Sequence, residues 1–348
     1  MLKYKVIEER GSSMGSTFIF ALNAILPIIL LVLLGYSLKK INFIDDGFIK
    51  ILNKFVFRIA LPILLFYNVY SINSLKDIDW SIILFSVVAV LVIYSMGLLF
   101  VMLTIKDPRQ KGVILQGIFR SNFALIGIPL AQALGGLPAL AIVSIISAFV
   151  IPLFNILSVI SLTIFQKNET GERISLTKLL KTIVTNPLII GVFVGLVALV
   201  IRMAVPRVNG ELVFSLKDDV AFLYTFIKSV SLTASPMALI ALGGQFEFAV
   251  VKSLASKIAV GVIWRVALTP AIVLTAAYLL ASRIPSINDS YPALIALFGS
   301  PIAVSSAIMV NEMGGDRQLA AQLVVWSTIS SIVTIFFTIV IMKYVGAI

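Results

Sequence analysis

The sequence predicts an all-helical, polytopic membrane protein in which ten transmembrane helices form two five-helix repeats of opposite orientation. Three observations indicate this fold class. Of the 348 residues, 60% are apolar and only 12% are charged, which is unlike a soluble domain. The apolar residues gather in ten long runs. Two of those runs contain interruptions at matching places in the two halves of the chain.

The ten runs follow a polar N-terminal tail, residues 1–16, which lacks the short apolar core and small-residue cleavage site of a signal peptide. Most runs exceed the roughly 20 residues that a helix needs to cross a bilayer. We expect membrane-spanning helices at about residues 17–38, 48–71, 80–105, 112–135, 138–165, 176–202, 219–243, 254–281, 291–312 and 319–345.

The distribution of Lys and Arg predicts the orientation. Basic residues are concentrated in the loops that follow odd-numbered runs: Lys39, Lys40, Lys50, Lys54, Lys106, Arg109, Lys111, Lys167, Arg173, Lys178, Lys181, Lys252, Lys257 and Arg317. The other loops carry only Lys76, Arg202, Arg207, Lys217 and Arg283. Because basic loops stay in the cytoplasm, we expect the odd loops there and both termini outside, with the protein in the cell membrane. We therefore attribute the net charge of +11 to basic loops that orient the protein in the membrane, and not to nucleic-acid binding.

The two halves share a pattern of prolines. Pro27 in the first run corresponds to Pro187 in the sixth, and Pro62 in the second corresponds to Pro236 in the seventh. With five spans in each half, the second copy enters the membrane from the opposite side, so the repeat is inverted about an axis in the membrane plane. The chain then divides into a first repeat (17–165), a cytoplasmic linker (166–175) and a second repeat (176–348).

Two runs are expected to be broken near mid-membrane. In the segment 117–136, Pro129 removes a backbone donor and Gly127 lowers the cost of irregular backbone. The segment 296–315 repeats this design in the second half. Irregular backbone survives within a membrane only where protein or a wet cavity satisfies it. Broken helices at matching places therefore predict the binding site of a transporter.

The residues at these breaks suit a small anion. Where half-helices meet, their N-terminal ends present free N–H groups and partial positive charge. Asn122 adds amide donors, and the serines add hydroxyls. The alternative interpretation is that small polar residues only cap broken ends or allow close packing, and for Ser305 and Ser306 both interpretations stay open. The candidate substrate-binding residues are Asn122, Gly127, Pro129, Ser300, Pro301, Ser305 and Ser306.

Charged side chains within the runs are the next candidates, because intramembrane charge is costly and usually functional. No Asp or Glu falls clearly in the middle of a run. We interpret Arg58 as reaching the membrane interface, as long basic side chains do. Arg120 lies two residues before Asn122 and is the basic residue nearest the site in sequence. Lys228 and Arg265 are either structural partners or functional charges.

The composition excludes most enzyme chemistry. The absence of His and Cys rules out the usual zinc sites, thiol chemistry and histidine acid/base catalysis. No mid-span acid pair and no P-loop (GxxxxGK[ST]) are present, which argues against an intramembrane enzyme and against ATP-driven transport. We therefore expect no catalytic residues, no cofactor and no metal.

Several motifs carry a family resemblance. Asn122–Leu130, reading NFALIGIPL, resembles the Asn-x4-Gly-Ile-Pro-Leu of the fourth helix in plant PIN auxin carriers. Further similarities, to the second and eighth helices and to bacterial members, lie at Leu61–Phe66, Arg265 with Leu268–Ala271, Pro301, Ala303, Gly315–Asp316, Leu319–Ala321 and Ser327–Thr328. Together they resemble the auxin efflux carrier family, and its bacterial branch in particular. One departure is Ser306, where the plant carriers have a second crossing proline.

The resemblance implies a fold shared with bile-acid symporters and sodium/proton antiporters, in which broken helices 4 and 9 cross. Helices 1, 2, 6 and 7 would form a scaffold through which two copies dimerise, and helices 3–5 and 8–10 a transport domain. Family members carry organic anions such as auxin, malate or malonate. We therefore expect a secondary transporter of small carboxylates that works by alternating access. A passive anion channel and a sodium-coupled symporter of the bile-acid type are the alternatives.

Overall fold

The computed structural model describes residues 26–71, 79–166, 176–208 and 211–348. The predicted tail, residues 1–16, and residues 167–175 of the predicted linker lie outside the described residues. Six helices of the described chain are long and apolar enough to cross a membrane: Trp80–Thr104, Phe123–Thr163, Pro187–Ala204, Ala221–Gly244, Phe248–Leu280 and Arg317–Tyr344. The chain is a helical, polytopic membrane protein.

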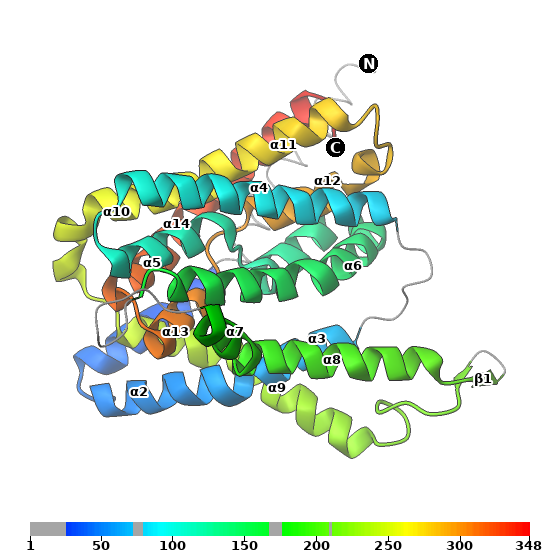
Figure 1. Ribbon diagram of the computed structural model, residues 1–348, viewed down its shortest axis with the longest axis horizontal. Coiled ribbons are helices and arrows are strands. Elements are labelled where there is room, and N and C mark those ends of the chain that lie inside the picture. The colour runs from blue at the N-terminus through cyan, green and yellow to red at the C-terminus, as the bar shows by residue number, and fades with distance from the viewer. Residues whose placement is uncertain (1–25, 72–78, 167–175, 209–210) are drawn as a thin grey trace, which may run out of the picture.

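The helices follow one another along the chain with short connections (Figure 1). In order they are residues 26–40, α2 (Asp46–Phe55), η1 (Val56–Ala60), α3 (Leu61–Tyr70), α4 (Trp80–Thr104), α5 (Pro108–Phe119), η2 (Phe123–Gly127), α6 (Ile128–Thr163), α7 (Leu176–Val184), α8 (Pro187–Ala204), α9 (Ala221–Gly244), η3 (Phe248–Val250), α10 (Val251–Ile263), η4 (Trp264–Leu268), α11 (Thr269–Leu280), α12 (Ser286–Gly299), α13 (Val304–Met313) and α14 (Arg317–Tyr344). The only strands among the described residues are β1 (Arg207–Val208) and β2 (Glu211–Leu212), which pair antiparallel.

Several of the few acidic residues in this chain begin helices. The carboxylate of Asp45 accepts a hydrogen bond from a backbone N–H of the first turn of α2, and Asp79, Asp107 and Asp316 do the same for α4, α5 and α14. A side-chain oxygen at this position satisfies one of the N–H groups that the first helical turn leaves unpaired. These acids are therefore used to start helices.

Prolines explain the widened turns within the helices. Each π-helical segment ends immediately before an x-Pro dipeptide: η1 before Pro62, η2 before Pro129 and η4 before Pro270. A proline ring clashes with the carbonyl four residues back and offers that carbonyl no N–H. One wider turn relieves the clash and keeps the helix continuous, as π-bulges do elsewhere.

The helices form two groups, one above the other in Figure 1. The lower group contains α2, α3, α8 and α9, and the upper group contains α4–α6, α10–α12 and α14. Within the lower group the backbones approach closely at glycines. A Cβ on Gly191 of α8 would lie 2.5 Å from the carbonyl oxygen of Pro62, and one on Gly243 of α9 would overlap the carbonyl oxygen of Val32. Small residues at these crossings are typical of helices that pack in membranes.

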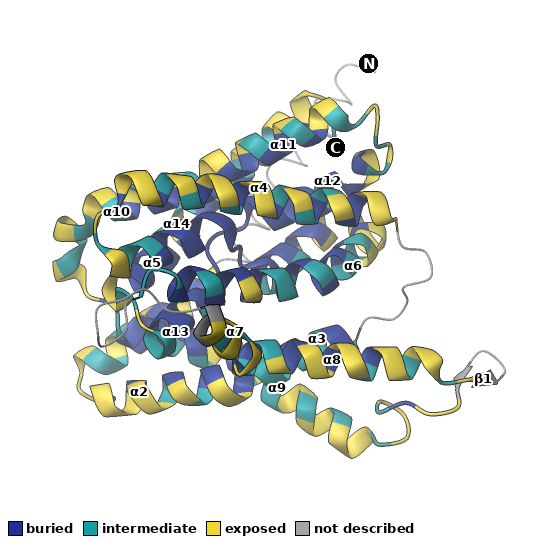
Figure 2. Cartoon of the chain, in the orientation of Figure 1, coloured by how far each residue is buried: buried dark blue, intermediate teal, exposed yellow. Residues whose placement is uncertain are grey.

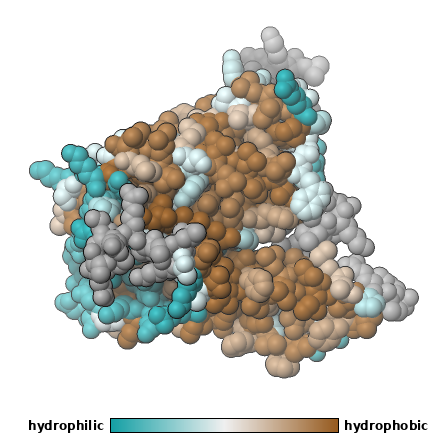
Figure 3. All heavy atoms as spheres, in the orientation of Figure 1, coloured by the Kyte–Doolittle hydropathy of each residue, from teal (hydrophilic) through white to brown (hydrophobic). Residues whose placement is uncertain are grey.

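The outer surface of the molecule is apolar. Buried residues gather between the helices, and exposed ones line the outer helices (Figure 2). On α4, for example, Leu84, Leu99 and Leu103 are exposed. Hydrophobic atoms cover most of the face shown in Figure 3, and hydrophilic atoms gather at one end. The loops after residues 26–40, α4, α9 and α13 lie at that end, and the C-terminus lies near the opposite end (Figure 1).

Two predicted runs differ from the structure. The sixth, 176–202, is divided into α7 and α8 because Asn186 caps α8 with its side chain and Pro187 follows. The predicted boundary between the fourth and fifth runs is a kink within α6, where Gly136 has φ 64° and ψ −150°. That conformation lies in the left-handed half of backbone space, which glycine adopts without steric cost.

Candidate functional site

Two interruptions from distant parts of the sequence lie side by side. α5 ends at Phe119 and η2 begins at Phe123, while α12 ends at Gly299 and α13 begins at Val304. Between them, Ser121 and Ile302 form an antiparallel bridge. The N–H of Asn122 donates to the carbonyl of Pro301 at 2.7 Å, and the N–H of Ala303 donates to the carbonyl of Arg120 at 3.3 Å. Each break therefore satisfies backbone groups of the other, as irregular backbone within a membrane requires.

Local sequence explains where the second break falls. Ser300 precedes Pro301 and has ψ 148°, an extended conformation. A residue before proline is pushed out of the helical region by the proline ring. Ala303 remains extended at ψ 132° before α13 starts. The break is therefore built into the Ser300-Pro301 pair.

Arg265 joins the ends of the two helices that lead into the breaks. Its side chain is fully buried and donates to five backbone carbonyls. Two of these carbonyls close α5, and three lie at the end of α12: Ile118, Phe119, Leu297, Phe298 and Ser300. The last carbonyls of a helix carry partial negative charge and lack partners within the helix. One guanidinium therefore neutralises both C-terminal ends.

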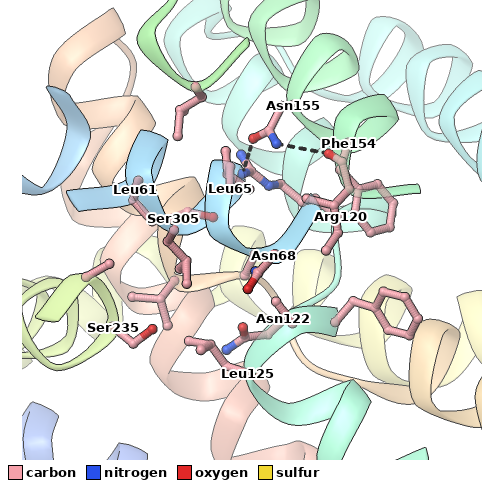
Figure 4. Close-up of a pocket in the computed structure, with 18 of the residues that line it drawn as sticks. Leu61, Leu65, Asn68, Arg120, Asn122, Leu125, Phe154, Asn155, Ser235 and Ser305 are labelled. Carbon is pink, nitrogen blue, oxygen red and sulfur yellow. Dashed lines mark hydrogen bonds between the residues drawn. The ribbon is translucent and has the colours of Figure 1, made fainter. Parts of the chain in front are cut away.

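The two helices that leave the breaks begin beside a cavity of about 70 Å³. Its wall includes the first residues of η2 and α13, together with side chains from α3, α6 and α9, as Figure 4 shows for part of the set. The lining residues are Leu61, Leu64, Leu65, Asn68, Arg120, Ser121, Asn122, Phe123, Ala124, Leu125, Ile151, Phe154, Asn155, Leu188, Ala234, Ser235, Ala238, Ala303, Val304 and Ser305. Residues from both groups of helices therefore surround it.

Arg120 supplies a charge at this cavity. The side chain is only 5% exposed. Its guanidinium donates to Asn155 Oδ1 at 2.8 Å, to Ser158 Oγ at 3.2 Å and to the sulfur of Met309. Asn155 is held in turn by its own bond to the Ile151 carbonyl (Figure 4). All these partners are neutral, and no acidic residue lines the cavity. The positive charge of Arg120 is therefore oriented but not neutralised.

Unpaired donors add to this positive character. No side chain caps the start of η2 or of α13, so the first N–H groups of both helices have no side-chain acceptor. The residues at both starts line the cavity. Asn122 is 4% exposed, and its Nδ2 has no hydrogen-bond partner. The hydroxyl of Ser121 likewise has none. Buried donors without partners are costly, so this cluster is arranged to receive an acceptor.

The predicted binding residues divide into two sets. Asn122 and Ser305 line the cavity. The others lie at or near the breaks and do not line it, namely Gly127, Pro129, Ser300, Pro301 and Ser306.

The residues of the second set have identifiable contacts or positions. A Cβ on Gly127 would lie 3.0 Å from the carbonyl oxygen of Ala296, so Gly127 allows η2 to approach α12. Ser300 bonds back to Ala296, and Ser306 has a buried, unpaired hydroxyl. Pro129 is exposed at the start of α6.

The residues predicted to supply supporting charge also differ in position. Arg120 lines the cavity, and Arg265 lies behind it against the helix ends. Lys228 is exposed on α9 and does not line the cavity. Arg58 is exposed as well.

Sequence reasoning missed Asn68, Asn155 and Ser235, which line the cavity together with Asn122 (Figure 4). Asn155 is the single amide of the run 138–165, and Asn68 follows the apolar stretch 59–66 of the run 48–71. An amide at membrane depth needs a hydrogen-bond partner, so a search of each run for isolated amides would have found both.

The residues that line the cavity are better suited to binding a ligand than to catalysing a reaction. Among the described residues, no group of three or more acidic, His or Cys side chains could hold a metal ion. The cavity offers one guanidinium, amide groups and two helix starts, which together favour a small anion. Its remaining wall is largely apolar.

A family model described as "Membrane transport protein" matches residues 20–339, which is most of the chain. No curated protein matches the sequence.

Proposed function

We propose that this chain, which belongs to the membrane transport protein family, is a secondary carrier that binds the carboxylate of a small organic anion at Arg120 and Asn122. The observation that carries the proposal is the buried guanidinium of Arg120, whose partners are all neutral, in a cavity wall that also holds Asn122 with its unpaired Nδ2. A carboxylate would accept from both groups and would neutralise the charge. Auxin-like acids and dicarboxylates such as malate or malonate are the substrate classes to compare.

We propose that the two groups of helices move relative to each other to give alternating access. In the proposed carrier, residues 26–40, α2, α3, α8 and α9 form the scaffold, and α4–α6 and α10–α14 form the transport domain. The cavity lies where these groups meet, and the antiparallel bridge between Ser121 and Ile302 supports an inverted 5+5 repeat of ten spans. We further propose a homodimer through the scaffold, a cell-membrane location with both termini outside, and a place in the bacterial branch of the auxin efflux carriers.

Two electrostatic features argue against sodium coupling. The cluster of five carbonyls at the breaks already binds the guanidinium of Arg265, and Arg120 adds a second positive charge nearby. Like charges in a poorly screened site repel strongly, so a sodium ion is disfavoured there. We therefore propose that transport does not depend on a sodium gradient.

Counterflow in proteoliposomes tests the function. Vesicles preloaded with an unlabelled carboxylate should accumulate the labelled compound transiently, and the initial rate should saturate with concentration. The panel is auxin, malate and malonate, each measured with and without a sodium gradient. Flux that neither saturates nor shows counterflow would establish the passive anion channel in place of the carrier. A rate that requires sodium would refute uncoupled transport.

A further inference from the structure

A second cavity, of about 100 Å³, lies apart from the first and shares none of its lining residues. Its walls come from residues 26–40, the end of α9, the start of η3 and one face of α14. The lining residues are Ile28, Ile29, Val32, Leu33, Tyr36, Leu239, Leu242, Phe246, Phe248, Val324, Val325, Trp326, Thr328 and Ile329. We refer to it as the interlayer cavity.

The walls of the interlayer cavity belong to helices that pack separately. Residues 26–40 pack closely on α9, where a Cβ on Gly35 or Gly243 would overlap the backbone of the other helix. The main neighbours of α14 are instead α10 and α13. The cavity therefore lies on the boundary between the lower and upper groups of helices.

The polar atoms in its α14 wall are already satisfied. Trp326 donates from Nε1 to Gln322 Oε1 at 3.0 Å, and Thr328 donates to the Val324 carbonyl at 2.7 Å. The rest of the wall is almost entirely apolar. A cavity with so apolar a wall does not hold water and instead takes apolar molecules.

The rim of the cavity is open to the apolar outer surface. Leu33, Phe248 and Ile329 are 48%, 58% and 39% exposed. In a chain that spans a membrane, the apolar medium at such a rim is the acyl chains of the bilayer.

The side chain of Lys40 lies next to Tyr36, one of the residues that line the cavity. The ammonium of Lys40 lies 5.9 Å from the ring centroid of Tyr36, whose ring packs edge-on against Phe248. Lys39 is paired with Asp46 at 2.6 Å, but the described part of the chain contains no such partner for Lys40. Lys40 also lies at the end where the basic loops gather, which attracts anionic lipid headgroups.

We propose that the interlayer cavity binds an anionic glycerophospholipid, with one acyl chain between residues 26–40 and α14 and the headgroup phosphate against Lys40. The positive charge of Lys40 favours an anionic headgroup, and the apolar walls of the cavity pack against the acyl chain. A lipid bound there lies between the two groups of helices.

Lipid retention tests the proposal without any transport assay. Purified protein is exchanged into mixtures of phosphatidylglycerol and phosphatidylcholine with identical acyl chains, and bound lipid is counted by native mass spectrometry. We expect phosphatidylglycerol to be retained preferentially. Lys40→Gln should weaken its retention about fivefold, the effect of one basic side chain at an anionic membrane surface. Lys50→Gln, an exposed lysine on α2 outside the cavity, should leave it unchanged.

A second variant tests whether the cavity binds the acyl chain of the lipid. Val325→Phe from α14 fills the cavity and should reduce retention of both lipids, while Lys40 and its charge stay in place. Equal retention of the two lipids in the wild type, or equal losses in Lys40→Gln and Lys50→Gln, would overturn the headgroup assignment. Unchanged retention in a folded Val325→Phe protein would overturn the cavity itself.

Discussion

Replacing Arg265 by Met should destabilise the protein strongly while leaving the cavity residues in place. The substitution removes the guanidinium and keeps a side chain of similar length in a fully buried position. Five carbonyls from the ends of α5 and α12 then lose their common donor. Their residual partial charges would also repel one another across the crossing.

The magnitude follows from the number and kind of bonds lost. A hydrogen bond to a charged group contributes about 1.5–3 kcal/mol, but five bonds to one group are not additive. Removing one partner of a buried charge interaction costs about 3–5 kcal/mol. We expect the free energy of unfolding to fall by an amount in this range. For a protein of this size that corresponds to a decrease in Tm on the order of 10 °C.

The assay is thermal unfolding in detergent, with Arg58→Met as the matched control. Arg58 also lies in a π-helical segment shortly before a proline, but it is exposed. Arg265→Lys should fall between wild type and Arg265→Met, because one ammonium retains the charge but cannot span both helix ends. An Arg265→Met protein that unfolds at the same temperature as Arg58→Met would refute this role.

Three further predictions follow from the site, the packing and the topology. Asn122→Ala should weaken carboxylate binding by about 0.5–1.5 kcal/mol, and Asn122→Asp should weaken it more because it places two negative charges together. If the Asn122→Asp protein binds the carboxylate as tightly as the wild type, Asn122 is not part of the anion site. Gly243→Ala should cost about 1–3 kcal/mol because its Cβ would overlap the Val32 carbonyl, whereas Gly299→Ala, with no atom nearer than 3.9 Å, should unfold like wild type. A label in the loop 166–175 should react only from the cytoplasmic side, and external labelling in intact cells would contradict the predicted orientation.

The helical fold class could be predicted because the length and hydropathy of the runs determine it. The run at 80–105 corresponds to α4 (Trp80–Thr104) within one residue, because Asp79 caps its start. The division of the sixth run was missed, although Asn186-Pro187 is a typical helix start. The π-helical turns before Pro62 and Pro270 were not anticipated, because a proline predicts a kink without specifying whether the helix breaks or widens.

The site was only partly predictable for a different reason. Asn122 and Ser305, which line the cavity, were predicted as candidates because they flank breaks that the sequence shows. Asn68 and Asn155 reach the same cavity from α3 and α6, and no local pattern links those helices to the breaks. Arg265 bonds to carbonyls of residues 118–119 and 297–300, contacts across more than thirty positions of sequence that only the tertiary structure reveals.

The most direct test of the central claim is the affinity of the Arg120→Gln protein for the carboxylate that most stabilises the wild type in a thermal-shift panel of auxin, malate and malonate. Arg58→Gln makes the same substitution at an exposed position and serves as the control. Losing a hydrogen bond to a charged group costs about 1.5–3 kcal/mol, so we predict binding about 10- to 150-fold weaker in Arg120→Gln and unchanged in Arg58→Gln. A folded Arg120→Gln protein that binds the carboxylate as tightly as wild type would contradict the account.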